Sequence, residues 1–451
     1  MILTRFPFPL LPSPPIIRSE ILCNFLDFQA RLIRELSPGA VVIHDFPGGG
    51  LDRRFDYAQA AKSLDAAAYN NYPVWGGQKE PLPPHEIAFG LDYIRGLKGQ
   101  NFWITEAIMG AQGHDVTGFL PRPNQAKMWS CQGMAHGCTA MLYFRYRGAV
   151  KGAEQFCYGV IDADNVKGRK FREVQSFFQD ISRYERALSA PIPSEVAIVY
   201  DYDCLASFRI QRQSILLDCQ NEMKKLYKPF YDGNVPVDVI PAQADISQYK
   251  VVLLPQMIIA RESFQERVKD FVRRGGTLVL TYRSAVKDTD NNLPFGQRVP
   301  VGFGELAGVR VEETESLHEL NAFPVIGENG FEGETGSGGI FRDMLKVRDA
   351  QVLYRYGDPF YTDYAAVTRR RQGEGTVYYL GCALDEKTTA RIMRAVLAEN
   401  QIDTIPSDSG VEVAVRGSGG QKVRILMNHN AVPASALGVT LPPFGYVIEP
   451  V

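Results

Sequence analysis

The 451-residue sequence has little net charge, only 3 tryptophans and no long apolar run. Its 49 Lys and Arg residues nearly balance 51 Asp and Glu residues, so the net charge is −2. That balance lacks the basic excess typical of proteins that bind nucleic acid. No stretch reaches the roughly 18 consecutive apolar residues of a membrane-spanning helix. We therefore expect neither a nucleic-acid partner nor a membrane.

Cysteine pairs are also missing. The 7 cysteines are scattered, with no Cys-x-x-Cys pair and no histidine at the spacing of a zinc finger. This pattern predicts reduced thiols in a cytoplasmic protein that holds no metal and no cofactor.

The composition is that of a globular protein large enough for more than one core. Hydrophobic residues make up 45% and charged residues 22% of the chain. At about 150 residues per domain, a single small binding module is excluded. The apolar stretch Met1–Ile17 contains five prolines, which prevent the helix of a signal peptide. We expect an irregular leader over residues 1–19.

Apolar runs alternate with helix-like segments from residue 20 to 188. Strands are expected at 40–44, 64–69, 102–105 and 140–144, and helices at 20–36, 55–63, 85–98, 124–137 and 171–187. Such alternation indicates parallel β/α units, as in a doubly wound sheet or a (β/α)8 barrel. In a barrel, only four of the eight units would be present.

A second alternating set follows the proline-containing linker at 189–194. It includes an expected helix over 211–231 and indicates an open, flavodoxin-like α/β sheet that extends, with glycine-rich loops, over 195–405. Short alternating strands between Gly and Asn turns then predict a small β domain over 406–451.

Polar residues follow each of the four strands expected before residue 188, where parallel β/α folds place their ligands. They are His44–Asp45, Tyr69–Pro73, Glu106 and Arg145–Arg147. A carboxylate such as Glu106 at this position is a nucleophile or acid/base, the partner of an arginine, or a cap for the next helix. The residues alone leave these three interpretations open.

Several runs in order resemble the second half of the catalytic barrel of the glycoside hydrolase family 42 β-galactosidases. They are Phe102–Glu106, Leu120–Asn124, Met128–Gly137, Tyr143–Arg147, Gly152–Phe156 and Gly159–Asp162, preceded by Leu32–Pro38 and Asn71–Pro73. The resemblance implies the C-terminal half of a (β/α)8 TIM barrel over 20–188, a trimerisation domain of flavodoxin or amidotransferase type over 195–405, and a small β domain. It also implies a β-galactoside substrate and a homotrimer.

The resemblance assigns roles to four residues of this chain. Glu106 falls on the nucleophile of a retaining mechanism, in which a carboxylate attacks the anomeric carbon. Glu154 falls on a glutamate that hydrogen-bonds galactose hydroxyls, and Tyr72 on a tyrosine that holds the nucleophile. Arg145 completes the set of expected sugar-binding residues.

The chain also departs from the family pattern. Cys157 stands where the family has a sugar-binding histidine, and residues 113–115 lack the tryptophan expected after the nucleophile. The family's acid/base comes from an Asn-Glu pair, and no such pair precedes Glu106. We therefore expect an N-terminally truncated β-galactosidase chain that is inactive alone. The rivals are a non-catalytic trimerising scaffold or sugar-binding remnant, and one half of a split gene.

Other conspicuous residues have structural interpretations. His136 is expected to be a packed structural histidine, and Cys131 and Cys138 small buried apolar residues. Gly48–Gly50 lacks the lysine of a phosphate loop and is expected to be a loop of the barrel. The strand that ends before Gln256 has no nucleophile turn, which favours an interface role for the second domain.

Overall fold

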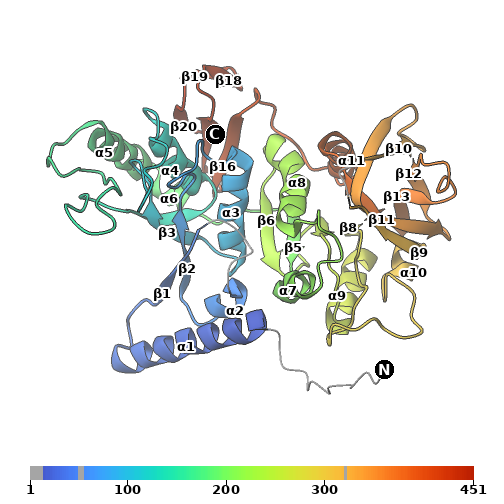
Figure 1. Ribbon diagram of the computed structural model, residues 1–451. Coiled ribbons are helices and arrows are strands. Elements are labelled where there is room, and N and C mark those ends of the chain that lie inside the picture. The colour runs from blue at the N-terminus through green and yellow to red at the C-terminus, as the bar shows by residue number, and fades with distance from the viewer. Residues whose placement is uncertain (1–13, 49–54, 319–321) are drawn as a thin grey trace.

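The computed structural model describes residues 14–48, 55–318 and 322–451, which fall into three parts (Figure 1). A four-stranded parallel sheet with its helices lies on one side, a larger mixed sheet on the other, and small antiparallel strands lie above the first part. Each part is an α/β or β unit whose order along the chain follows the order of the sequence patterns.

The first sheet has the strand order β1-β2-β3-β4, with every neighbouring pair parallel. Its elements are α1 (Pro14–Leu36), β1 (Ile43–Phe46), α2 (Tyr57–Ala61), β2 (Ala66–Asn71), α3 (Pro84–Gly96), β3 (Phe102–Ala107), α4 (Gln125–Ala135), β4 (Cys138–Tyr143), α5 (Arg169–Ser182) and α6 (Glu185–Leu188). All four predicted strands are present, and their ends differ from the predicted ends by at most three residues.

The strands of this sheet bury one face far better than the other. Along β3, Phe102 and Ile104 are buried against the helices, whereas Trp103 and Thr105 are only partly covered. On β4, Leu142 is 51% exposed. Parallel sheets are normally covered on both faces, so the partly exposed face of this sheet is unusual.

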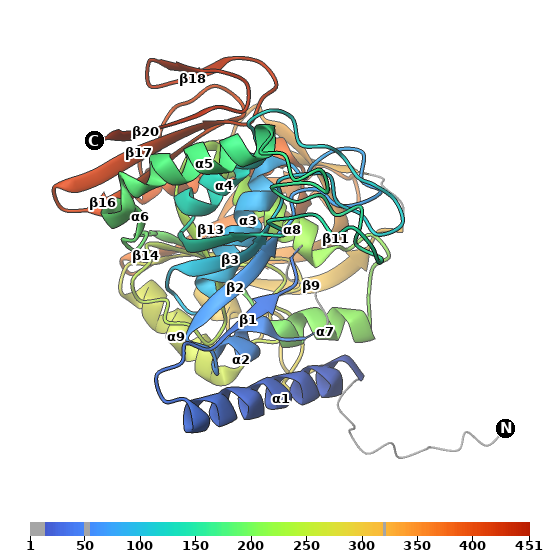
Figure 2. The same ribbon diagram turned by 90° about the vertical axis from the view of Figure 1, so that its left-hand side faces the viewer.

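Helix α1 corrects the prediction of an irregular leader over residues 1–19. The helix already begins at Pro14, so residues 14–19 are helical, while residues 1–13 lie outside the described part of the chain. Proline is tolerated there because the first turn of a helix needs no N–H donor. Figure 2 shows α1 lying across the base of the molecule. Its exposed apolar side chains repeat at helical spacing: Ile21, Phe25, Phe28, Leu32 and Leu36.

The second part has a parallel centre with the strand order β6-β5-β7-β8-β14. Numbered along the chain, these strands follow the 2-1-3-4-5 order of doubly wound sheets of flavodoxin type. Its elements are β5 (Val196–Tyr200), α7 (Tyr202–Ile210), α8 (Cys219–Asp232), β6 (Val237–Pro241), β7 (Val251–Leu254), α9 (Glu262–Arg273), β8 (Thr277–Thr281), β14 (Gly375–Leu380) and α11 (Glu386–Glu399).

Two expectations for this part were wrong. The helix expected over 211–231 is α8 alone, because residues 211–218 form an irregular connection after α7. The stretch expected to be glycine-rich loops instead carries most of an antiparallel extension of the same sheet. Its elements are α10 (Gly304–Ala307), β9 (Val309–Ser316), β10 (Phe323–Gly327), β11 (Thr335–Val347), β12 (Gln351–Tyr356), β13 (Ala365–Gln372) and β15 (Cys382–Leu384). Glycines within β11 hid its strand pattern, since glycine lacks the side chain that shows alternation.

The C-terminal part contains a three-stranded sheet and a separate hairpin. The sheet has the order β16-β17-β20, and the hairpin pairs β18 with β19. Their bounds are β16 (Val411–Ser418), β17 (Gln421–Asn428), β18 (Ala434–Ala436), β19 (Val439–Leu441) and β20 (Tyr446–Pro450). Across the described ranges, no helix has the length and apolar character to cross a membrane.

A buried polar network joins the three parts on the helical side of the first sheet. His136, at the end of α4, contacts Asp92 on α3 through Nδ1 at 2.6 Å and Glu412 on β16 through Nε2 at 2.8 Å. Tyr227 on α8 donates to Asp92 at 2.6 Å. The sequence correctly predicted a structural His136, and Cys131 and Cys138 are buried as expected. The charged partners of His136 come from segments distant in sequence.

Candidate active site

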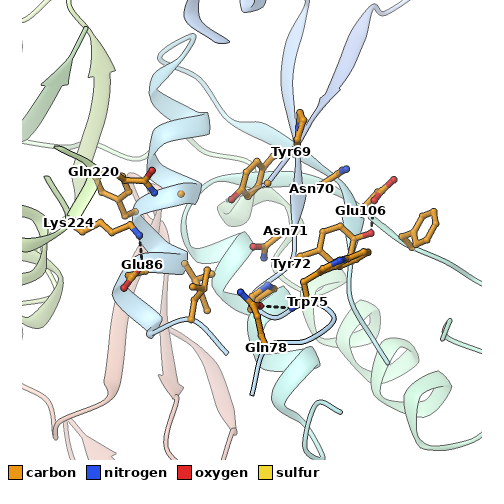
Figure 3. Close-up of a pocket in the computed structure, with 18 of the residues that line it drawn as sticks. Tyr69, Asn70, Asn71, Tyr72, Trp75, Gln78, Glu86, Glu106, Gln220 and Lys224 are labelled. Atoms are coloured by element: carbon orange, nitrogen blue, oxygen red, sulfur yellow. Dashed lines mark hydrogen bonds and ion pairs between the residues drawn. The ribbon is translucent and has the colours of Figure 1, made fainter. Parts of the chain in front are cut away.

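A pocket of about 640 Å³ opens at the carboxyl ends of β2 and β3 and extends toward α8 (Figure 3). Three of the four predicted site residues line it: Tyr72, Glu106 and Glu154. Arg145 is outside the lining and reaches the pocket through its contact with Glu154. The structure thus brings the predicted residues together at the strand ends, the edge at which parallel sheets bind ligands.

Glu106 lies near the end of β3 and is half-buried. The hydroxyl of Tyr72 donates a hydrogen bond to its Oε2 at 2.5 Å, which Figure 3 shows as a dashed line. Burial raises the pKa of Glu106, the Tyr72 hydrogen bond opposes that rise, and the carboxylates Asp45 and Glu154 add to it. The pKa of Glu106 lies above its ordinary value as a result.

Tyr72 is a permanent hydrogen-bond donor at this site. Burial and the adjacent Glu106 raise the pKa of its hydroxyl far above the usual range. The phenol therefore stays protonated at every physiological pH and keeps one oxygen of Glu106 in a fixed direction.

A group of rings extends the wall beyond Tyr72. Trp75 meets Tyr72 edge to face with a centroid distance of 4.8 Å, and meets His114 in the same way at 5.6 Å. Sequence reasoning missed Trp75, because it sought a tryptophan in the loop after Glu106. The ring comes instead from the connection between β2 and α3, three residues after Tyr72. The closeness of Trp75 to Tyr72 in the sequence was the signal that could have placed it at this site.

Glu154 and Arg145 form an ion pair on the loop that follows β4. The Nε2 atom of His114 lies 3.7 Å from the other carboxylate oxygen of Glu154. Two cationic or potentially cationic groups thus hold Glu154. The nearby Cys157 is buried with its thiol directed to the carbonyl of Gly113 at 3.7 Å, and it does not line the pocket. The sulfur of Cys157 is therefore not part of the pocket wall.

The opposite end of the pocket belongs to another part of the chain. Glu86 on α3 forms an ion pair with Lys224 on α8, and Gln220 lies beside them (Figure 3). The second part of the molecule therefore supplies one wall of the pocket.

A close approach of two backbones closes the pocket near β1. At Gly48, a Cβ atom would lie 2.1 Å from the carbonyl oxygen of Asn70, so only glycine fits. Gly49 and Gly50, predicted with it to form a loop, lie outside the described residues. Within the described residues, no group of three or more His, Cys, Asp or Glu side chains is arranged to hold a metal ion.

Comparisons with known proteins show the family to which the chain is related. Residues 17–184 match a family model described as beta-galactosidase, and residues 194–403 match one described as beta-galactosidase trimerisation domain. Over 425 residues the chain is 30% identical to beta-galactosidase BgaA of Clostridium cellulovorans, with 92% of this chain and 62% of that protein covered. It is 28% identical over 420 residues to beta-galactosidase BgaP of Planococcus sp. (strain L4), with coverages of 92% and 61%.

The fold has the same relatives. The crystal structure of beta-galactosidase from Bacillus circulans sp. alkalophilus superposes with a TM-score of 0.89 at 26% identity, covering 95% of this chain and 66% of that one. Sequence and fold together define a protein of the glycoside hydrolase class. The chain belongs to the glycoside hydrolase family 42 β-galactosidases. It spans 62% and 61% of the length of the two curated relatives.

Proposed function

We propose that this chain carries the nucleophile half of a retaining β-galactosidase, with Glu106 as the nucleophile. The observation that carries the proposal is the 2.5 Å hydrogen bond from Tyr72 to Glu106 inside a pocket at the carboxyl end of β3. A carboxylate fixed by a phenol can direct its free oxygen toward an anomeric carbon. Glu154, held by Arg145, offers acceptor oxygens for sugar hydroxyls.

In this proposal the sheet β1-β2-β3-β4 is the second half of a (β/α)8 barrel. Support comes from its four parallel strands and from the poorly covered inner face at Leu142. Closed barrels fill this face with side chains from the remaining strands. The small β part and the doubly wound sheet then correspond to the family's C-terminal and trimerisation domains.

The chemistry of this half is limited by its carboxyl groups. A retaining glycosidase needs an acid/base carboxyl about 5–5.5 Å from the nucleophile, on the other side of the glycosidic bond. No Asn-Glu pair precedes Glu106 in this chain. Since general acid assistance is worth about 10²–10⁴-fold, we expect the chain alone to leave lactose unhydrolysed. An aryl galactoside with an activated leaving group needs no such proton.

The test compares lactose with 2,4-dinitrophenyl β-galactoside, using the full chain. We expect no glucose release from lactose, and slow dinitrophenol release that Glu106→Gln abolishes. Glu185→Gln is the matched control, because it makes the same chemical change at an exposed position on α6. Dinitrophenol release that survives in Glu106→Gln contradicts the assignment of the nucleophile.

Two other outcomes distinguish the alternatives. Galactose binding without any release of dinitrophenol supports the sugar-binding remnant. Rapid lactose turnover shows that another carboxyl supplies the proton.

We also propose that the chain forms a homotrimer in the cytoplasm. The match of residues 194–403 to a trimerisation domain supports the oligomer. All 7 cysteines are free, which suits a reducing compartment.

A further inference from the structure

The ring of Trp75 connects two pairs of residues that line the pocket. It meets the ring of Tyr72 at a centroid distance of 4.8 Å and an interplanar angle of 79°, and Figure 3 shows the two side by side. It also meets His114 at 5.6 Å and 90°. Tyr72 in turn donates to Glu106, and His114 Nε2 lies 3.7 Å from Glu154. One indole ring therefore links the two carboxylates of the proposed site.

The backbone around Trp75 is fixed within its own loop and against the next one. Gln78 Oε1 accepts from the Trp75 N–H at 2.6 Å, and the Gln78 N–H donates to the Trp75 carbonyl at 3.1 Å. A Cβ atom at Gly76 would lie 2.5 Å from the carbonyl oxygen of Val116, and one at Gly118 would lie 2.8 Å from that of Trp75. The loops after β2 and β3 therefore pack backbone against backbone.

The loop after β3 is bound in turn to the loop after β4, which carries Glu154. The Tyr158 N–H donates to the Ala111 carbonyl at 3.1 Å, and Gln112 Nε2 donates to the Tyr158 carbonyl at 3.0 Å. Three loops at the same edge of the sheet thus form one assembly. Their backbone contacts hold Trp75 in place at the pocket wall.

These backbone contacts do not fix the direction of the Tyr72 hydroxyl. A tyrosine side chain turns about two torsions, and its one hydrogen bond to Glu106 restricts them only weakly. The edge-to-face contact with Trp75 restricts them further, because such contacts favour particular relative orientations of two rings. Trp75 is partly buried, so its own ring has little freedom to follow Tyr72.

We propose that Trp75 is a positioning residue that orients the Tyr72 hydroxyl toward Glu106 and ties this pair to the loop that carries His114. The inference rests on the proposed role of Glu106 as the nucleophile. The rings that Trp75 meets are those of Tyr72 and His114, so its effect on Glu106 passes through Tyr72. Without the indole, Tyr72 should take more than one orientation and donate to Glu106 only part of the time.

The experiment measures the protonation of Glu106 in the full chain and needs no turnover. Glutamates are labelled with ¹³C at Cδ, and the Glu106 signal is assigned by its loss in Glu106→Gln. A hydrogen-bond donor favours the charged carboxylate, so Tyr72→Phe should raise the titration midpoint of Glu106 by about one to two pH units. Trp75→Ala should raise it by about half a unit or more. Trp75→Phe keeps a ring and should restore most of the wild-type midpoint.

A double variant tests the route of the effect. Trp75→Ala combined with Tyr72→Phe should give no further rise above Tyr72→Phe, because the hydrogen bond is already lost. Trp103→Ala is the matched control, since it removes a partly covered indole from β3, outside the pocket lining. The Glu106 midpoint should stay unchanged in this control. If Trp75→Ala fails to fold, Trp75→Leu tests the same direction of change.

Three results would overturn the proposal. They are an unchanged Glu106 midpoint in a folded Trp75 variant that lacks a ring, a further rise in the double variant, and an equal rise in Trp103→Ala. Failure of the proposed nucleophile is seen separately. Dinitrophenol release that survives in Glu106→Gln overturns that assignment, whatever the titration midpoints are.

Discussion

The two parallel sheets of this molecule arise from similar alternating sequence patterns but are covered very differently. Every residue of β5, β7 and β8 in the second part is buried. In the first part, β1 buries only Phe46 fully, and β4 only Cys138. Similar sequence patterns therefore do not reveal how well each sheet is covered.

The face of the first sheet that its helices cover is, by contrast, in close contact with the other parts of the molecule. There α3 packs against β6, and Arg95 binds Asp238 across the junction at 2.7 Å. The Asp92, His136 and Glu412 network adds charged contacts to the third part. The first sheet therefore contacts the other parts through its helices, and its other face, the interior of the proposed barrel, is poorly covered.

The largest effect on stability should come from the face of the first sheet that contacts the other two parts. Glu412 accepts hydrogen bonds from His136, His429, Gln132 and Tyr231 and is almost fully buried. Glu412→Gln removes the charge that balances His136, so we expect a loss of about 3–5 kcal/mol in unfolding free energy. Urea denaturation measures it. A loss below 1 kcal/mol, which is the size typical of exposed pairs, would show that the network does not join the parts.

A pair of leucines tests the difference between the sheets directly. Leu253 on β7 is fully buried, whereas Leu142 on β4 is 51% exposed. Leu253→Ala should cost about 2–5 kcal/mol and Leu142→Ala about 0.5 kcal/mol or less. The same denaturation experiment compares them. Equal losses of unfolding free energy would mean that the face of the first sheet that carries Leu142 is covered in solution.

The pH dependence of stability should come from His136. Burial lowers its pKa, but Asp92 and Glu412 outweigh burial and raise the pKa to about 9. The unfolded value is about 6.5, so the stabilisation is complete below pH 6.5 and is lost as the pH rises toward 9. We expect the wild type to lose up to about 1.4 kcal/mol per pH unit in this window, relative to His136→Gln. If the unfolding free energies of the wild type and of His136→Gln change with pH in the same way, the predicted role of His136 is wrong.

The smallest effect on stability, but a visible one on assembly, should follow from two exposed rings. Phe295 and Phe360 lie on loops of the proposed trimerisation domain and are 103% and 87% exposed. Exposed aromatic residues are typical interface anchors. The double variant Phe295→Ser and Phe360→Ser should sediment as a monomer at micromolar concentration with nearly unchanged stability. Phe178→Ser, on α5 of the first part, is the control and should leave the sedimentation unchanged.

Sequence alone predicted that the proposed site residues lie at one edge of the first sheet, because each of them is local to a strand end. Glu106 follows an apolar run, and Tyr72 and Arg145 follow two others, so each could be placed at the same edge without a structure. Trp75 was missed because its position near His114 depends on how two separate loops fold. The strands between residues 309 and 356 were missed because pairing with distant strands, rather than local pattern, holds them.

The sequence by itself determined the class of fold, the family and the strand ends that bear the polar residues, because periodicity and short motifs are local properties. Only the tertiary structure decided which face of the first sheet is covered, which charges meet His136, and that Thr105 and Asn70 donate hydrogen bonds to Asp45. The covering of a sheet face and the pairing of charges depend on segments far apart in the chain. Strand register, including the shifts between β3 and its neighbouring strands, decided the contacts of Asp45, and no local pattern encodes them.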